Sequence, residues 1–479
     1  MTGSFAQRTQ KFWEWFTANE EKLSALALTR TPNDADSNRI VEFVSEGLSL
    51  ISQDIRFNIG GEHEFTFTVS GNSAMFFLLP YITANLPQQF RDKWKFFPCM
   101  PGTGGNNFGF RMIEHDKIVD TDNVFVSVTP DEENKSVDLR FYAKEWEVLD
   151  DNNCYNAFFT LMDISIGEAL AHAYINKVDR ATAHTDDMIA LTTLEKWLLD
   201  NLCEDGKIPN PADKYFAYQQ KPDGNTNPPR LDIFTGSGNY TPIINDYYNG
   251  EDITYKTFAG FGAKSVFLYY YYDEKADQKV VLNQRYELQY KLEAEVLGER
   301  GSGKEIGLSL GGAMGNWCAY IDLLLFDDEA FFEKAKTLLA DTSIMFFCQE
   351  FVHNGQTLLL FDQDDDSFNQ RLQQLHEVDV HFEIADILEA LPEMDYTQKG
   401  IYARALNNLN REDEALKVLE SVREQGENDK LWFFRYGYAL MNLDRPKEAI
   451  TAFHRAKELG DDLEDTDQFI AMCEEALKK

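Results

Sequence analysis

The residues that could carry out chemistry are few and widely spaced in this sequence. His184 lies close to Asp186 and Asp187, and His63 has a glutamate on either side. A metal site or a general base at either place needs a further partner that only the fold could supply. There is no HExxH motif, no CxxC pair and no Cys/His cluster of the zinc-binding kind. These patterns predict no metal, no cofactor and no catalytic residues.

Two glycine-rich segments resemble anion-binding loops in composition. Gly298 to Lys304 has the spacing of a phosphate-binding loop, but Glu305 stands where a hydroxyl should hold magnesium. The segment also runs from a predicted helix into a predicted strand, which reverses the required order, so we expect a plain glycine turn. Pro101 to Gly109 has backbone amides that could cradle an anion. It contains no lysine or arginine, and we expect a mobile surface loop.

Three alternating aspartates, Asp362, Asp364 and Asp366, imitate the start of a calcium loop, because hard cations prefer clustered oxygen ligands. Ser367 stands where that loop needs glycine, and Gln373 replaces its bidentate glutamate. The run therefore predicts a solvated linker.

One enzyme hypothesis remains open as an alternative. A site between two α+β domains could be lined by Asp163, Glu168 or His172 and bordered by a glycine loop. The glycines concerned are Gly102, Gly104, Gly105 and Gly109. A pocket with convergent carboxylates of perturbed pKa would favour this hypothesis.

Hydrophobic periodicity predicts the elements that would position these residues. We expect helices at 9–28, 37–52, 73–79 and 155–178, with strands at 55–59, 65–69, 94–97, 124–128 and 137–142. Strands grouped between helices make residues 1–190 an α+β domain. Between Glu204 and Asp252 the composition shifts to Pro, Gly, Asn, Asp and Tyr, which predicts loops, and we assign residues 191–260 to a helical and loop-rich connector.

The next region has a β-α-β-β-α-β order of predicted elements between residues 265 and 351. That order is typical of a ferredoxin-like sandwich, which we assign to residues 261–361. Residues 362–479 read as entirely helical. The predicted fold is thus two α+β domains, the second ferredoxin-like, followed by an all-α region.

Composition excludes several classes of partner. Among 479 residues, 43% are hydrophobic and 13% aromatic, which is enough for packed cores. The formal net charge of −36 would repel phosphate backbones and anionic lipid, so we expect neither nucleic acid nor membrane partners. Six scattered cysteines indicate buried thiols in a reducing compartment. With no apolar leader or membrane-length run, the sequence predicts a cytoplasmic protein.

The strongest pattern is a repeat of period 34 near the C-terminus. Many identities share that offset, including Ala405 with Ala439, Leu406 with Leu440, Asn408 with Asn442, Leu409 with Leu443, Arg411 with Arg445, Glu414 with Glu448 and Ala415 with Ala449. A helix-turn-helix unit of this length cannot bury its apolar face alone and must stack on a neighbour. The repeat predicts a short helical array, which is a binding architecture.

The copy at residues 431–462 resembles a tetratricopeptide repeat. Gly437 would be the small residue of its first helix, and Ala449, Phe453 and Ala456 fall on the small-large-small positions of its second. The copy at 398–428 is degenerate but in phase, 466–477 would cap the array, and 368–391 would lead it.

The resemblance implies a ligand-facing surface on the first helix of each unit. Carried over by phase, it points to Arg404, Asn407, Asn408, Phe434, Arg435, Tyr438, Met441 and Asn442. Arginine and asparagine suit a carboxylate or peptide amides, and the aromatic residues supply apolar contact area. The alternative is that Phe434, Tyr438 and Met441 pack against the preceding α+β domain.

The first three quarters of the chain loosely resemble uncharacterised bacterial α+β domains of unknown function. The carrying segments are residues 12–16, 64–71 and 163–168, with Gly311-Gly312 and Tyr320-Ile321-Asp322 further on. Some such domains accompany toxins as immunity proteins, which implies one alternative function. Our principal hypothesis is a cytoplasmic bacterial adaptor that binds an unknown protein or peptide, with homo-oligomerisation through the repeats as a further alternative.

Overall fold

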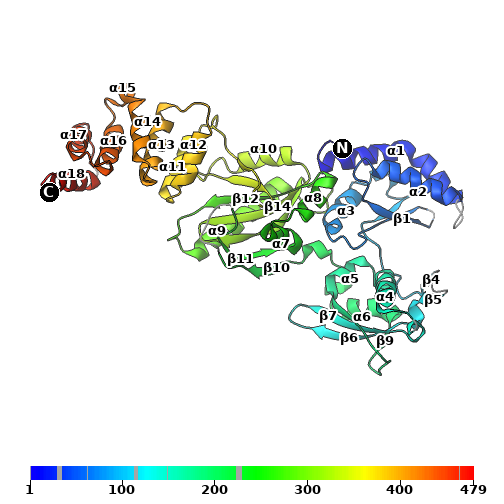
Figure 1. The fold of residues 1–479 in the computed structure, drawn as a ribbon. Helices are drawn as coiled ribbons and strands as arrows, with labels where there is room; N and C mark the ends of the chain where they lie inside the picture. Colours follow the sequence, from blue (N-terminus) through cyan, green and yellow to red (C-terminus); the bar gives the residue numbers. More distant parts are fainter. Residues whose placement is uncertain are drawn as a thin grey trace.

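The computed structural model describes residues 2–29, 35–61, 63–112, 117–147, 149–222, 229–462 and 464–478. It is a mixed α+β chain with a C-terminal region made of helices, as the sequence predicted (Figure 1). In these described residues, three sheets of three, four and seven strands and one two-stranded hairpin make up the β-structure. Within the described residues, every helix is too short or too polar to cross a membrane.

The first unit is a small three-stranded sheet covered by an aromatic-rich helix. Its elements are α1 (Phe5–Thr29), α2 (Ala35–Leu48), β1 (Arg56–Gly60), β2 (Glu64–Thr68), α3 (Met75–Ala84) and β3 (Lys95–Phe97). The predicted hairpin is present, because β1 and β2 pair antiparallel, while β3 adds to β2 in parallel. Phe12 and Phe16 of α1 are fully buried against the sheet, where the rings of Phe65 and Phe96 stack 4.7 Å apart.

The second unit has a sheet and a core of its own. The sheet order is β8-β7-β6-β9, and α4, α5 and α6 contribute the buried helical residues. The elements are β4 (Gly109–Met112), β5 (Lys117–Asp120), β6 (Phe125–Asp131), β7 (Ser136–Tyr142), α4 (Asp151–Ile166), α5 (Glu168–Tyr174), β8 (Ile175–Arg180), β9 (Ile189–Ala190) and α6 (Leu194–Asn201). Residues 1–190, which we expected to form one α+β domain, thus contain two separate sheets.

The prediction of one long helix at 155–178 is wrong. Gly167 has φ +82°, a backbone conformation that residues with a Cβ disfavour, and it separates α4 from α5. A Cβ at Gly167 would lie 2.6 Å from the backbone nitrogen of Gly102. Residues 175–180 are strand β8, which pairs in parallel with β7. The sequence pattern missed this strand because its apolar residues also fit a helical spacing.

The third unit is built on a seven-stranded antiparallel sheet of order β10-β11-β13-β14-β12-β15-β16. Its elements are β10 (Phe216–Gln219), β11 (Ile233–Gly238), α7 (Thr241–Asn249), α8 (Ile253–Phe261), β12 (Lys264–Tyr271), α9 (Gln278–Lys291), η8 (Leu292–Leu297), β13 (Gly307–Gly315), β14 (Cys318–Leu325), α10 (Asp328–Leu338), β15 (Phe347–Glu350) and β16 (Thr357–Leu359). Helices α9 and α10 cover one face of this sheet, and α7 and α8 pack on the other.

The third unit contains the predicted order of elements and additional strands that the sequence did not predict. The β-α-β-β-α-β order is present as β12, α9, β13, β14, α10 and β15. The segment at 204–252, expected to be a loop-rich connector, instead supplies β10, β11 and α7, and β11 pairs with β13. Polar and glycine-rich strands such as β11 lack the alternation that sequence patterns detect.

The first unit docks on the third, although the second unit lies between them in sequence. The backbone nitrogen of Phe5 donates to Gly262 O at 2.8 Å, and its ring lies 5.1 Å from that of Phe326. Phe77 of α3 packs against Tyr240 at 5.0 Å. The two units therefore share one apolar core.

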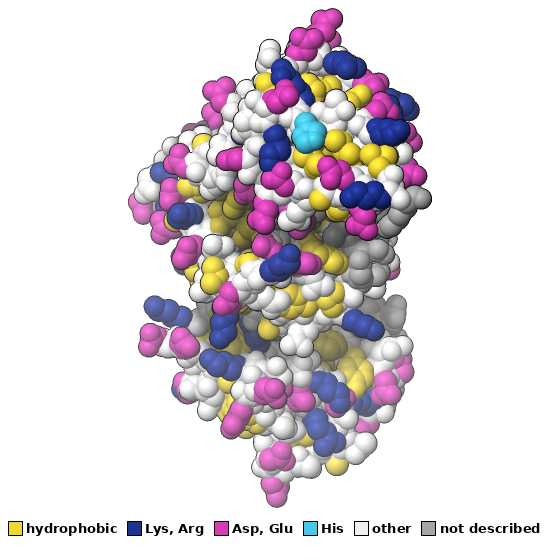
Figure 2. All heavy atoms as spheres, turned by 90° about the vertical axis from the view of Figure 1, so that its left-hand side faces the viewer, with side chains coloured by type: hydrophobic (Ala, Val, Ile, Leu, Met, Phe, Trp, Pro, Cys, Tyr) yellow, Lys and Arg dark blue, Asp and Glu magenta, His cyan; other side chains and the backbone are white. Residues whose placement is uncertain are grey.

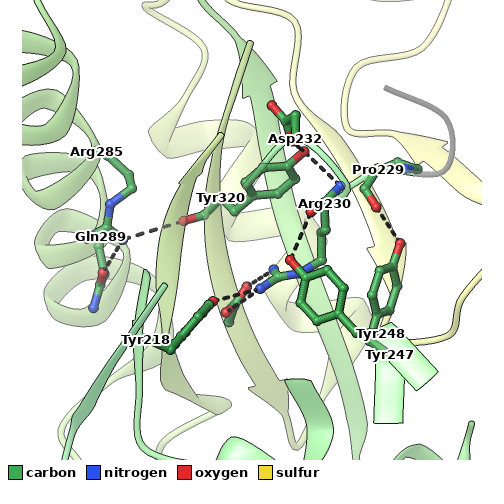
Figure 3. Close-up of polar contacts among 10 residues, drawn as sticks. Tyr218, Pro229, Arg230, Asp232, Tyr247, Tyr248, Arg285, Gln289 and Tyr320 are labelled. Carbon is green, nitrogen blue, oxygen red and sulfur yellow. Dashed lines mark hydrogen bonds and ion pairs between the residues drawn. The ribbon is translucent and has the colours of Figure 1, made fainter. Parts of the chain in front are cut away.

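A buried ion pair links the segment before β11 to the large sheet (Figure 3). Arg230, just before β11, donates to Asp322 of β14 at 2.5 and 3.3 Å, and both side chains are at most 2% exposed. Its guanidinium also lies 5.1 Å from the ring of Phe267 and donates to Tyr218 Oη. Burial alone would lower the pKa of Arg230, but the Asp322 carboxylate more than offsets this and raises it.

The C-terminal region consists of paired helices. They are α11 (Phe368–Glu377), α12 (His381–Glu389), α13 (Tyr396–Asn408), α14 (Glu412–Glu420), α15 (Arg423–Gly426), α16 (Lys430–Asn442), α17 (Pro446–Glu458) and α18 (Glu464–Ala476). The 34-residue offset appears in the geometry. Arg411 pairs with Glu414 and Arg445 with Glu448, each at 2.7 Å.

Removing one partner of the buried pair should destabilise the third unit strongly. We expect Asp322→Asn to lower the free energy of unfolding by about 3–5 kcal/mol, because it leaves the Arg230 charge buried without its counter-ion. Asp328→Asn, which removes a surface partner of Lys264, should change it by less than about 1 kcal/mol. Urea unfolding with hydrogen exchange at β12 and β14 measures both. Equal effects of the two variants would contradict a stabilising role for the buried pair.

Candidate functional site on the C-terminal helices

The C-terminal helices are arranged in two layers (Figure 1). Helices α11, α13, α16 and α18 contact one another in sequence order, and α12, α14 and α17 pack behind them. We call the outer surface of the first group the first-layer face. Two of its helices, α13 and α16, contain the residues for which the sequence predicted peptide contacts.

Small residues allow the helices to approach closely. A Cβ at Gly437 of α16 would lie 2.8 Å from the Phe453 ring of α17, so only glycine fits there without displacing that ring. Gly426 likewise leaves room for the ring of Trp432, whose Nε1 donates to Leu419 O at 3.0 Å. These contacts hold α16 close to α17 and to α14 and α15.

Two arginines on the first-layer face lack a carboxylate partner among the described residues. Arg435 is half-buried over Gly400, where an added Cβ would lie 2.5 Å from its Nη1, and its guanidinium makes no hydrogen bond or ion pair. Arg404 is exposed and reaches only Gln373 Oε1, at 3.4 Å. Desolvation lowers the pKa of both side chains. Both remain charged at neutral pH, so the face presents cations that are poorly compensated.

The nearest carboxylate to Arg435 is already engaged. Asp429 favours the charged form of Arg435 electrostatically. However, its Oδ1 caps α16 by accepting from Leu431 N at 2.8 Å, and its Oδ2 accepts from Tyr396 Oη at 2.6 Å. The carboxylate therefore stabilises the helix start and leaves the guanidinium open.

The predicted asparagines have different environments. Asn407 is only 5% exposed, and its Nδ2 donates to Arg435 O at 3.1 Å, so it bridges α13 and α16 inside the array. Asn408 is exposed and donates to Arg404 O at 2.9 Å. Asn442 is exposed on α16. The structure thus places Asn408 and Asn442, but not Asn407, where a ligand could reach them.

The predicted aromatic contacts are used within the array. The rings of Phe434 and Tyr438 lie 6.0 and 5.3 Å from Phe469 of α18, and Met441 is partly buried beside them. They therefore pack against the terminal helix and not against the preceding α+β units. All three side chains are half-buried.

Sequence reasoning missed three residues that surround Arg404. Gln373 comes from α11, and His376 and His381 lie at the α11–α12 turn, their Nδ1 atoms 3.0 Å apart. His376 is 2% exposed, and its Nε2 contacts Ile401 O at 3.2 Å. The leading helices lack the repeat pattern, so no signal in the sequence placed these side chains beside α13.

A second candidate site is a cavity of about 350 Å³ between the first and second units. It brings together Asp163, Glu168 and His172 with Ser73 and Phe76 from the first unit. All of these residues lie within 1–190, whereas the enzyme hypothesis placed the site between that domain and residues 261–361. Burial, and then the charge of Glu168, raises the pKa of Asp163 to about 6. Burial lowers the pKa of His172. The predicted glycines do not line this cavity.

The glycine-rich segments already hold carboxylates. Gly104 N donates to Glu195 Oε2 at 2.8 Å, and Pro101 bridges to Gly167, so the 101–109 segment is anchored at these points. At the other segment, Glu305 accepts from Gly301 N at 2.9 Å and from Ser302 Oγ at 3.0 Å. The Glu305 carboxylate thus takes up the donors of this glycine turn.

The remaining motifs have structural roles. Gly307 to Gly311 spells a GxSxG pattern, but all of it lies inside β13, and Ser309 Oγ accepts from Gln289 Nε2. His63 contacts Ser24 Oγ at 3.1 Å, and His184 packs on Phe125. Asp362 pairs with Lys336. Among the described residues, no group of His, Cys, Asp and Glu could hold a metal ion.

Comparison of the chain with protein-family models, curated proteins and solved structures found no match. Function must therefore be argued from the two sites themselves. Of these, the first-layer face combines exposure with uncompensated charge.

The buried His376 makes the helical region sensitive to acid. Burial is the main cause that lowers its pKa to about 3, and the charge of Arg404 adds to it. The unfolded chain takes up a proton near pH 6.5 but the folded chain does not, so stability is full above pH 6.5 and is lost as the pH falls toward 3. We expect a loss of roughly 2 kcal/mol between pH 8 and pH 5.

Thermal melts of the full chain at pH 8 and pH 5, in parallel with His376→Gln, test this expectation. Glutamine can still donate to Ile401 O but does not titrate, so the variant should lose most of the pH dependence. A wild type and variant with the same pH profile would show that another group is responsible.

Proposed function

We propose that this protein is an adaptor that binds peptides through the first-layer face of its C-terminal helices, with no covalent chemistry. The observation that carries the proposal is the pair of arginines, Arg404 and Arg435, on neighbouring helices. Their charges are partly desolvated and lack a carboxylate. A ligand carboxylate would supply the missing counter-charge through charge-assisted hydrogen bonds.

Three other arginines of the same region provide the contrast. Arg411 pairs with Glu389 and Glu414, Arg445 with Glu448, and Arg455 with Glu458, each at 2.9 Å or less. An acidic chain with many available carboxylates thus pairs these arginines and leaves two on one face unpaired. Unpaired charge that is partly withdrawn from water lowers stability, so its presence favours a binding role.

The charges around the first-layer face are of both signs. Apart from its carboxylate, a bound peptide could therefore carry residues of either charge. Residues 396–479 carry 13 Lys and Arg against 17 Asp and Glu, although the whole chain has a net charge of −36. Figure 2 shows acidic and basic side chains interspersed over this end of the molecule, with small apolar groups between them. An acidic ligand end is therefore not repelled here as it would be by the chain as a whole.

We infer that the C-terminal array is tetratricopeptide-like. The 34-residue geometric offset, the glycine at the α16–α17 crossing and the capping position of α18 support this. We also infer a ferredoxin-like arrangement for the centre of the large sheet, supported by the order β13-β14-β12-β15 with all neighbours antiparallel. In this proposal the α+β units hold the array and the array binds the partner in the cytoplasm.

A peptide library displayed with free C-termini tests the carboxylate contact. Arg404→Gln and Arg435→Gln should each weaken selected peptides by about tenfold or more, because a hydrogen bond to a charged group contributes about 1.5–3 kcal/mol. Arg445→Gln is the matched control, since Arg445 is satisfied by Glu448 on the second helix. Peptides that bind equally well with an amidated C-terminus, or that all three variants retain, would contradict the proposal.

A further inference from the structure

The cavity between the first and second units has an unusual chemical composition. Its lining joins Asp163 of α4 and Glu168 and His172 of α5 to aromatic side chains from both units. Phe76 belongs to α3 and lies 5.0 Å from the His172 ring, while Phe159 of α4 is 42% exposed. Acidic groups therefore face aromatic surfaces within about 350 Å³, the lower end of the size range of small-molecule sites.

The two carboxylates of the cavity differ in how they are satisfied. Glu168 is 5% exposed, and each of its oxygens accepts two hydrogen bonds. Oε1 accepts from Thr68 Oγ1 at 2.5 Å and Ser70 N at 3.2 Å, and Oε2 from Val69 N at 3.1 Å and Met100 N at 2.9 Å. Glu168 therefore fastens the β2–α3 turn of the first unit to α5 of the second, and it has no capacity left for a ligand.

Asp163 is the opposite case. Its carboxylate is half-buried and makes no hydrogen bond or ion pair with the described residues. Desolvation and the neighbouring Glu168 both disfavour its charge. Lys214, whose charge acts on His172, donates to Asn134 O and Ala173 O, and His172 is held neutral by burial and by the charge of Lys214. The protein thus leaves one carboxylate without a counter-ion beside aromatic walls.

We propose that this cavity binds a small organic cation, with Asp163 as its counter-ion and Phe76 and Phe159 as its aromatic contacts. An ammonium group is attracted both by a carboxylate and by the faces of aromatic rings. A divalent metal ion fits less well, because the oxygens of Glu168 are saturated and Asp163 would be its sole carboxylate ligand. Since the lining comes from two units with separate cores, the ligand also holds these units together.

Calorimetric titration of the full chain with choline, putrescine and agmatine tests the site, with 3,3-dimethylbutanol as the uncharged counterpart of choline. We expect at least one cation to bind and the alcohol to bind at least tenfold more weakly. Asp163→Asn should weaken the cation at least tenfold, and Phe159→Leu severalfold. Asp200→Asn, on α6 of the same unit, removes only an exposed pair with Lys196 and should leave binding unchanged.

Proton competition provides a second readout. Because the pKa of Asp163 is about 6, lowering the pH from 7.5 to 5 should weaken the cation by about tenfold. Glu168 and His172 are the other titratable groups that line the cavity, so Asp163→Asn must remove most of this dependence for the assignment to hold.

A structural role for Asp163 predicts different results. If the aspartate only supports the fold, Asp163→Asn will lower the melting temperature of the free protein, whereas removal of an uncompensated charge should keep or raise it. The proposal is overturned by a lower melting temperature, by equal binding of the alcohol, by binding of Mg²⁺ or Zn²⁺ that requires Asp163 in place of the amines, or by no binding of any cation at millimolar concentration.

Discussion

The buried ion pair between Arg230 and Asp322 is the constraint on which the large sheet depends. Two charges removed from water are favourable only with close geometry and further hydrogen bonds. Here the guanidinium also donates to Tyr218 of the edge strand β10 and lies over the rings of Phe267 in β12 and Phe351 after β15. One side chain thus contacts residues from widely separated strands of the sheet. Tyr320 adds a second link by donating to Asp232 and accepting from Arg230 N (Figure 3). The polar segment before β11 is thereby fixed in a single place on an apolar surface.

That surface is the platform for the other parts of the protein. The first unit packs on it through Phe5 and Phe77, and the helical region docks where Tyr271 of β12 donates to Glu383 at 2.6 Å. Arg371 completes the second junction by donating to Ile344 O, Leu339 O and Ala340 O. Both junctions are made of buried contacts, so the first-layer face of the array is held on a rigid support.

The treatment of charge separates structural from candidate functional groups. Buried Arg230 has a carboxylate, buried Arg371 has backbone carbonyls, and Glu168 has four donors. Arg435 and Asp163 are partly withdrawn from water, yet neither has a partner among the described residues. An unpaired group of this kind lowers the stability of the fold. Such a group is retained where a ligand completes the site. Each of the two proposed sites thus presents an unpaired charge that is partly withdrawn from water, positive at Arg435 and negative at Asp163.

The sequence alone determined the elements whose signals are local. The 34-residue period reported the helix pairs, and the Gly60-Gly61 turn between alternating strands reported the first hairpin, because propensity and spacing act within a few residues. It did not reveal β8 or β11, which become strands through pairing with distant partners. It also could not show that Asn407 is buried, that Phe469 covers Tyr438, or that Asp163 faces Phe76 across two units. Those facts depend on contacts between residues far apart in the chain, and only the tertiary structure decides which side chains remain without a partner.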